Sequence, residues 1–213
     1  MTVDLSKFHH IAFDLDGVLV DSQAVVELAL RRWAQDRGYS PDLVIELSAG
    51  RRDQELVAEV APHRDPEAEA KCIADFEIEV MSQLRAIDGA EQFFRSIPSA
   101  RKSIVTSSTK EAATARLRQL GIPLPKVLIS ADDVTRGKPD PQPYELLLET
   151  VGVLAEECLV FEDSPTGIAA ALAAGCGCVG VGAAAQNCQG IMEWIPDFGQ
   201  GLNPAAVNSL RGV

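Results

Sequence analysis

The stretch His9-His10-Ile11-Ala12-Phe13-Asp14-Leu15-Asp16-Gly17 decides the fold. It begins as an apolar run of strand length and stops at two aspartates and a glycine. Residues i and i+2 of a strand point to the same side, so Asp14 and Asp16 share a side, and Gly17 permits a sharp turn behind them. Two carboxylates this close do not both stay ionised easily without a cation. Taken alone, the pair has a plainer interpretation as a solvated acidic turn.

Apolar runs of the same kind recur at 103–106, 127–130, 159–161 and 178–181. Helical patterns separate them at 110–120, 141–151 and 165–174, with Ser108, Asp140 and Ser164 as expected caps. Apolar strands that alternate with helices indicate a parallel sheet covered on both faces. We therefore predict an α/β fold with a doubly wound parallel sheet.

Residues 23–86 interrupt this alternation. They contain helical stretches at 24–37, 54–60 and 66–84, with breakers at Gly38, Pro41, Gly50 and Pro62, and no convincing strand. A helical block between the first strand and the next βα unit reads as an inserted cap. We predict a core domain formed by residues 1–22 and 87–213, and an all-helical cap domain formed by residues 23–86.

Composition restricts the partners. The chain has 213 residues, with 31 acidic against 19 basic residues and a net charge of −12, so a phosphate backbone or an anionic membrane surface is an unfavourable partner. Five cysteines, an odd number without zinc-site spacing, predict reduced thiols and a cytoplasmic protein. We expect no nucleic acid and no membrane as partner, and a monomer, with a dimer left open.

Polar residues also follow the later apolar runs. Thr106-Ser107-Ser108 and Glu162-Asp163-Ser164 stand at two strand ends, and Lys138 lies in a loop before a helix. Singly, these residues read as helix caps or a solvated lysine. A parallel sheet gathers strand ends at one edge, however, which would bring carboxylates, a hydroxyl and an ammonium together. That set suits a phosphoryl group, with oxygen ligands for Mg²⁺, a carboxylate nucleophile and donors for the phosphoryl oxygens.

Four segments together resemble a known family. Asp14-Leu15-Asp16-Gly17-Val18-Leu19-Val20-Asp21-Ser22, Thr106-Ser107-Ser108, Gly137-Lys138-Pro139-Asp140-Pro141 and Phe161-Glu162-Asp163-Ser164-Pro165-x-Gly167 are similar, in order, to the four motifs of the haloacid dehalogenase (HAD) superfamily. The helical block resembles the small cap of the subgroup that contains β-phosphoglucomutase and phosphoglycolate phosphatase. The segment around Lys138 is most similar to the sugar and polyol phosphatase branch.

The resemblance implies a role for each motif residue. Asp14 would be the nucleophile that forms an aspartyl-phosphate. Asp16 would be the general acid and then the base, and its backbone carbonyl would bind Mg²⁺. Thr106 and Lys138 would hold phosphoryl oxygens. Asp163 would ligate Mg²⁺, and Glu162 would ligate it or order its waters.

Further positions of the resemblance concern the substrate. Ser107 and Ser108 are assigned to substrate binding, as is the cap segment Gly50-Arg51-Arg52, in which Arg52 aligns best with an arginine that related caps present to the substrate. A solvated basic pair is the plainer interpretation of this segment. Asp88-Gly89 replaces the usual Pro-Gly at the cap exit, which leaves the hinge position open.

The resemblance implies a Mg²⁺-dependent phosphatase of a small phosphorylated metabolite, with sugar or polyol phosphates favoured. A sugar phosphomutase and a phosphoglycolate phosphatase are the alternatives. Val26 stands where the mutases use a cap histidine, which argues against the first of them. A signalling receiver domain also surrounds a phosphorylatable aspartate with acidic residues, a hydroxyl and a lysine, but it has no helical block after its first strand.

Overall fold

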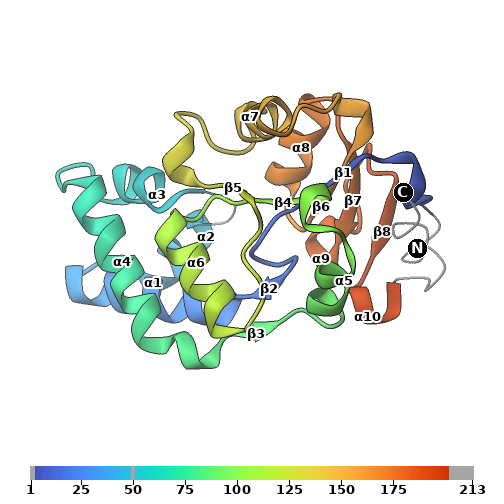
Figure 1. Cartoon of the computed structure of the whole chain (residues 1–213). Helices are drawn as coiled ribbons and strands as arrows, with labels where there is room; N and C mark the ends of the chain where they lie inside the picture. Colours follow the sequence, from blue (N-terminus) through green and yellow to red (C-terminus); the bar gives the residue numbers. More distant parts are fainter. Residues whose placement is uncertain (1–2, 49–50, 202–213) are drawn as a thin grey trace.

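The computed structural model describes residues 3–48 and 51–201, and its centre is a six-stranded parallel sheet in the order β5-β4-β1-β6-β7-β8 (Figure 1). The strands are β1 (His10–Phe13), β4 (Lys102–Val105), β5 (Val127–Ile129), β6 (Cys158–Glu162), β7 (Gly177–Val181) and β8 (Glu193–Ile195). The first five of these are the predicted apolar runs, and β8 forms one edge of the sheet. The α/β class and the parallel sheet are therefore confirmed.

Helices cover both faces of this sheet (Figure 1). On one face, Phe13 of β1 stacks on Phe161 of β6 and packs against Phe93 and Phe94 of α5. On the other face, Ala12 packs in a second cluster with side chains of α7 and α8. The covering helices are α5 (Ala90–Ser96), α6 (Lys110–Gln119), α7 (Gln142–Val151) and α8 (Pro165–Ala173), followed later by the short α9 (Gly182–Ala185) and α10 (Phe198–Gly201). Because every β1 residue is buried, both faces of the strand contribute to a core.

The helical block consists of α1 (Gln23–Arg37), α2 (Pro41–Ser48), α3 (Asp53–Val60) and α4 (Pro66–Val80). It has an apolar core of its own, in which Trp33 is the largest fully buried side chain. Three of its helices match the predicted stretches, whereas α2 was missed because Pro41 was interpreted as a breaker. Proline is tolerated in the first turn of a helix, where its missing N–H is not needed, and Pro41 begins α2.

The chain enters and leaves the helical block through two adjacent strands. β2 (Val20–Asp21) pairs antiparallel with β3 (Arg85–Ala86). A short 3-10 turn, Met81–Gln83, ends the predicted 66–84 helix before β3 is reached. The division at residues 22/23 and 86/87 stays a prediction, and this two-stranded ribbon is where the two covalent connections run side by side.

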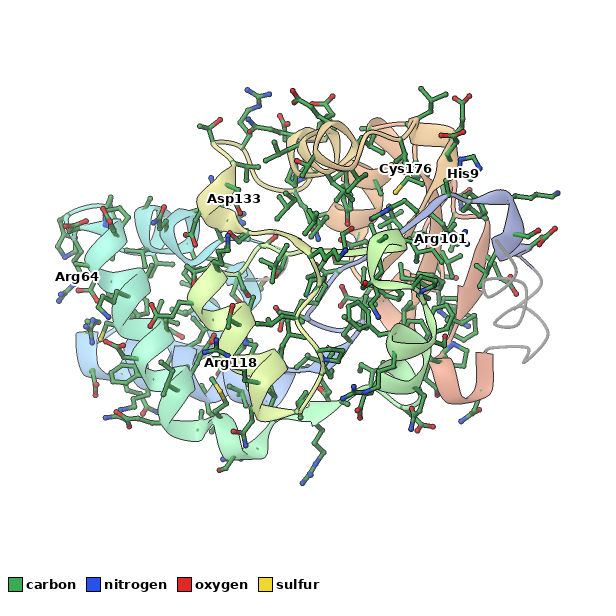
Figure 2. All side chains as sticks on the ribbon, in the orientation of Figure 1. His9, Arg64, Arg101, Arg118, Asp133 and Cys176 are labelled. Atoms are coloured by element: carbon green, nitrogen blue, oxygen red, sulfur yellow. The ribbon has the colours of Figure 1, made fainter. Side chains whose placement is uncertain are left out.

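Other features agree with the sequence or refine it. All five cysteines are free. In the part of the chain that the structure describes, no helix combines the length and apolarity that a membrane crossing requires. His9 lies at the opposite end of the molecule from Arg64 of the helical block (Figure 2), and His10 contacts Ser103 within the sheet. His9 is largely exposed and pairs with Glu157 at 3.0 Å.

Candidate active site

The predicted site residues lie at the carboxyl edge of the sheet. Asp14 directly follows β1, and its N–H donates to the Phe161 carbonyl at 2.9 Å, which continues the pairing with β6. Thr106 follows β4 and is held in the same way by the Ile129 carbonyl at 2.9 Å. Glu162 is the last residue of β6. The sheet itself thus brings these residues, far apart in sequence, to one place.

Lys138 reaches this edge from the loop before α7. Its Nζ donates to Asp14 Oδ1 and to Glu162 Oε1, both at 2.6 Å, and to the Val105 carbonyl at 3.1 Å. An ammonium has three hydrogens to donate, so these three acceptors fix its position. Burial alone would lower the pKa of Lys138, but the Asp14 and Glu162 carboxylates outweigh it and raise that pKa. The charged form of the lysine is therefore favoured beside Asp14.

Glu162 is enclosed completely. Oε1 accepts hydrogen bonds from Lys138 and from the Tyr144 hydroxyl at 2.8 Å, and Oε2 accepts from the N–H groups of Asp163 and Ser164. A Cβ at Gly167 would lie 1.9 Å from Oε1, so only glycine lets α8 pass this close. Because both oxygens already have donors, the arrangement suits a group that fixes Lys138 and the following loop. It could bind a cation directly only by exchanging some of these contacts.

The donor set fits a divalent cation. Asp14, Glu162 and Asp163 each offer one carboxylate oxygen, and these oxygens lie within 4.8 Å of one another. Three carboxylates against the one Lys138 ammonium leave two uncompensated negative charges. Accordingly, burial and then the neighbouring Glu162 raise the pKa of Asp163 to about 7. Burial likewise raises the pKa of Asp14, although Lys138 opposes it. A metal ion at this cluster would compensate that charge.

Gly17 makes room for this cluster. Its φ of +80° lies in the left-handed region, and a Cβ there would lie 2.0 Å from Asp163 Oδ2. Glycine therefore serves both the turn after β1 and the close approach of the loop after β6. The glycine of the opening sequence stretch is required by the site as well as by the turn.

Asp16 is held by core side chains on one oxygen. Ser108 Oγ donates to Oδ2 at 3.0 Å and Arg116 Nη1 donates to it at 2.7 Å. The other oxygen, Oδ1, is buried and has no hydrogen-bond partner among the described residues. Ser108 is not the cap of α6 that we expected, because Thr109 caps this helix through Ala112 N–H. The Ser108 hydroxyl is thereby available to Asp16.

A cavity of about 210 Å³ opens over these groups. Its floor contains Asp14, Asp16, Thr106, Ser107, Ser108, Lys138 and Asp163, and the helical block supplies Val26, Leu30, Ser48, Arg51, Asp53 and Glu77. A larger cavity, of about 480 Å³, lies between α4 and α6 and contains none of the strand-end carboxylates. We therefore place the candidate site in the smaller cavity, whose size suits a small substrate.

The residues of the predicted substrate-binding segment Gly50-Arg51-Arg52 do not share one location. Arg51 lines the cavity and forms an ion pair with Glu59. Arg52 instead turns toward the loop before Lys138, where its guanidinium bonds Glu55 and the Val134 and Thr135 carbonyls. Gly50 lies outside the described residues. In this arrangement Arg51 rather than Arg52 faces the candidate substrate space.

The sequence reasoning missed several residues of the site. Glu77 and Arg116 are buried and joined by an ion pair, and Asp53 lies in the same cavity wall. Arg116 is buried on the same side of α6 as Ala113, three residues before it, and Leu117, the residue after it. A charged residue on the apolar face of a helix is a usable signal, because burial of a charge requires a partner. Its partner in α4 could not be read from the sequence.

Comparison with known proteins now adds to the geometry. The model of the haloacid dehalogenase-like hydrolase family matches residues 8–175. The chain belongs to this family. Membership in the haloacid dehalogenase-like hydrolases makes the protein an enzyme, and it confirms the resemblance seen in the four motifs.

Individual relatives are phosphatases by name. The chain is 35% identical over 183 residues to hexitol phosphatase A of Escherichia coli, covering 82% of this chain and 83% of that protein. It is 32% identical over 187 residues to glycerol-1-phosphate phosphohydrolase 2 of Saccharomyces cerevisiae, covering 82% and 75%. The crystal structure of CbbY from Rhodobacter sphaeroides in complex with phosphate superposes with a TM-score of 0.83 over 94% of this chain and 99% of that chain. At 21% identity it supports the fold alone.

Proposed function

We propose that this protein is a magnesium-dependent phosphatase that hydrolyses a small phosphorylated sugar or polyol. The observation that carries the proposal is the contact between Asp14 and Lys138 beneath a small cavity that also contains Asp16 and Thr106. A carboxylate beside a fixed ammonium can attack a phosphoryl group whose oxygens that ammonium also stabilises. The hexitol and glycerol phosphatases among the relatives support the substrate class.

The proposed reaction has two steps. Asp14 attacks phosphorus, its Oδ–P bond forms, and the bond from phosphorus to the alcohol oxygen breaks while Asp16 gives that oxygen a proton. Water then attacks the aspartyl-phosphate, Asp16 takes a proton from the water, and the bond to Asp14 breaks. Thr106 uses its hydroxyl as acceptor for Ser108 N–H at 3.0 Å, which leaves the hydroxyl hydrogen free to bind a phosphoryl oxygen.

The metal would be held by the cluster described above. We assign Asp14 and Asp163 as carboxylate ligands and the Asp16 backbone carbonyl as a third, and we assign Glu162 to ordering Lys138 and the ligand loop. Bound Mg²⁺ supplies positive charge that offsets the charge developing on the phosphoryl oxygens. Magnesium suits this site because its oxygen ligands are carboxylates and carbonyls.

A phosphomutase is disfavoured by the cavity wall. Val26 lines the cavity, and its side chain cannot exchange a proton with a sugar hydroxyl. Asp14, by contrast, only needs water for turnover in a phosphatase. A mutase would instead need a protein group that helps a second hydroxyl attack.

The test is phosphate release with Mg²⁺ from hexitol, hexose, glycerol and glycolate phosphates, with Asp14→Asn as the control. We expect hydrolysis of one or two esters, and a fall of about 10⁴-fold or more in the variant, because the nucleophile is lost. Isomerisation of a sugar phosphate only after addition of a bisphosphate would favour the mutase. Appreciable activity of Asp14→Asn would contradict the assignment of the nucleophile.

A further inference from the structure

Arg116 occupies an unusual position between the two parts of the molecule. It projects from α6 of the core, its side chain is 3% exposed, and its guanidinium contacts groups from both sides. Nη1 donates to Asp16 Oδ2 and to Ser108 Oγ, both at 2.7 Å, and Nη2 donates to Glu77 of α4. The planar fork of arginine fixes the relative positions of the groups it binds.

The contacts of Arg116 define the orientation of Asp16. Both donors, Ser108 and Arg116, bind the same oxygen, Oδ2, whereas the buried Oδ1 has no partner in the described chain. A carboxyl group held by one oxygen can present the other to a reacting group without rotating. Oδ1 is therefore the atom of Asp16 that is left to exchange a proton with a substrate.

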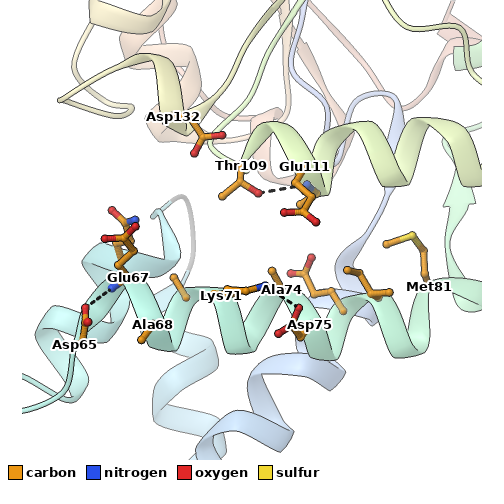
Figure 3. Close-up of a pocket in the computed structure, with 15 residues that line it drawn as sticks. Asp65, Glu67, Ala68, Lys71, Ala74, Asp75, Met81, Thr109, Glu111 and Asp132 are labelled. Carbon is orange, nitrogen blue, oxygen red and sulfur yellow. Dashed lines mark hydrogen bonds and ion pairs between the residues drawn. The ribbon is translucent and has the colours of Figure 1, made fainter.

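The anchor on the other side of Arg116 belongs to the helical block. Glu77 is 3% exposed and lines both the candidate site and the larger cavity between α4 and α6. Figure 3 shows this larger cavity, in which small side chains such as Ala74 on α4 face Thr109 and Glu111 of the opposite chain segment. Apolar packing between the helices is interrupted there, so the ion pair of Glu77 with Arg116 is a principal link between α4 and α6.

The other side-chain hydrogen bonds across this boundary are weaker. In the ranges 3–48 and 51–201 they come from Arg52, which reaches the Val134 and Thr135 carbonyls at 3.4 and 3.3 Å. Burial of Glu77 also requires its partner, because a buried carboxylate without one is strongly unfavourable. The contact of α4 with α6 thus gives Glu77 its charged partner, whereas Arg116 Nε stays buried without a hydrogen-bond partner among the described residues.

We propose that Arg116 is a positioning residue for the general acid Asp16, and that Glu77 of the helical block holds the Arg116 guanidinium in the position that serves Asp16. The inference rests on the proposed function, because it assigns Asp16 a proton transfer. Without the Glu77 carboxylate, the Arg116 guanidinium would keep its hydrogen bonds to Asp16 and Ser108 but lose the partner that fixes Nη2. The hydrogen bond from Arg116 Nη1 to Asp16 Oδ2 would then no longer be held in one geometry.

The chemistry separates this role from a structural one. Departure of an alkoxide from phosphorus requires the proton that Asp16 supplies as the bond from Asp14 to phosphorus forms. Departure of acetate from acetyl phosphate requires no such proton, because acetate leaves as a stable anion. For both substrates, kcat/KM covers only the steps up to departure of the leaving group, so water attack does not enter it. A misaligned acid must therefore affect the alkyl ester alone.

The experiment compares kcat/KM for ethyl phosphate, for the best ester of the panel, and for acetyl phosphate, which ethyl phosphate matches in size. In Arg116→Gln we expect kcat/KM for the esters to fall by about 10–100-fold, since misplacing a general acid removes much of its contribution. For acetyl phosphate we expect a change of less than about threefold. Glu77→Gln keeps the shape of the side chain and one acceptor oxygen. It should also lower kcat/KM for the esters and not for acetyl phosphate, but by a smaller factor than Arg116→Gln.

Matched controls come from the same helices. Arg118→Gln changes an exposed arginine of α6, and Glu79→Gln changes a glutamate of α4 that pairs with Arg32 at the surface. Both should leave the ratio of ester to acetyl phosphate activity unchanged. If Arg116→Gln does not fold, Glu77→Gln decides the outcome.

Two results would overturn the inference. Equal losses for the esters and acetyl phosphate would show that Arg116 is only structural, and unchanged activity in Glu77→Gln would show that the helical block does not act through it. A wild-type protein that releases phosphate from none of these compounds would contradict the proposed function itself, and this inference with it. If the wild type hydrolyses both the esters and acetyl phosphate, the proposed function stands, and a negative result with the variants then counts against the role of Arg116 alone.

Discussion

Replacement of Lys138 by methionine should destabilise the protein strongly and in a pH-dependent way. Lys138 is 7% exposed, and its ammonium binds the Asp14 and Glu162 carboxylates at 2.6 Å. Methionine fills a similar volume but leaves these two buried carboxylates facing each other without the positive charge. Removing one partner of a buried ion pair typically costs about 3–5 kcal/mol, and we expect a loss of this size in the free energy of unfolding at about pH 8.

The pH dependence follows from Asp14. The charge of Lys138 opposes the rise in the pKa of Asp14 that burial causes, so its removal raises that pKa further. A carboxyl whose pKa is higher in the folded than in the unfolded chain stabilises the fold at low pH, and this stability is lost as the pH rises through the folded value. The difference between variant and wild type should therefore shrink from about pH 8 to about pH 5. Urea denaturation without metal at both pH values measures it.

Lys102→Met is the matched control. Lys102 is also 7% exposed, but its ammonium contacts the Phe94 carbonyl and ring rather than a carboxylate. Its replacement should cost about 1.5–3 kcal/mol, the value of one hydrogen bond to a charged group, with little change between the two pH values. A loss in Lys138→Met that is equal at both pH values, or no larger than that of the control, would refute the reasoning.

Three further changes test other parts of the site. Mg²⁺ should raise the midpoint of thermal unfolding of the wild type, because a ligand that binds only the folded chain stabilises it. Asp163→Asn should lose most of this shift. Equal shifts in the wild type and the variant would contradict the assignment of Asp163 as a ligand. Gly167→Ala should lower the free energy of unfolding by about 1–3 kcal/mol in urea denaturation and reduce turnover, since its Cβ would lie 1.9 Å from Glu162 Oε1. A variant with unchanged stability and unchanged turnover would disprove the tight contact. Burial and then Glu77 raise the pKa of Asp53 from 3.8 to about 7, so the wild type loses stability as the pH rises through this range. Asp53→Asn cannot ionise and should be more stable than the wild type at about pH 8 but not at about pH 4, and urea titrations that show no gain at the higher pH would count against this.

The sheet and its polar edge could be predicted because both depend on local patterns. Strand ends in a parallel sheet share an edge, so Asp14, Thr106 and Glu162 could be placed together before their contacts were known. Lys138 was predicted by its motif, although its loop shows no pattern that points to the sheet. Element boundaries were less predictable. Pro41 begins a helix rather than preventing one, and Thr109 replaces Ser108 as the cap of α6.

The contacts between the helical block and the core could not be predicted in the same way. Glu77 and Arg116 are 39 residues apart, and their pairing depends on how α4 rests against α6. Arg52 aligns best with the substrate-binding arginines of related caps, yet its side chain reaches Glu55 and the loop carbonyls instead. Such outcomes depend on tertiary packing, which periodicity and spacing along one chain do not specify.

The separate apolar core of the helical block has a consequence for how this protein can change. The side chains that would bind and cleave the phosphate rest on the packing around the sheet, whereas Trp33 and its neighbours stabilise the block independently. Substitutions at Ser48, Arg51 or Asp53 can therefore reshape the cavity wall that would meet the substrate without disturbing the strands beneath Asp14. A protein divided in this way can acquire new substrates through one half of the molecule while the other half conserves the reaction.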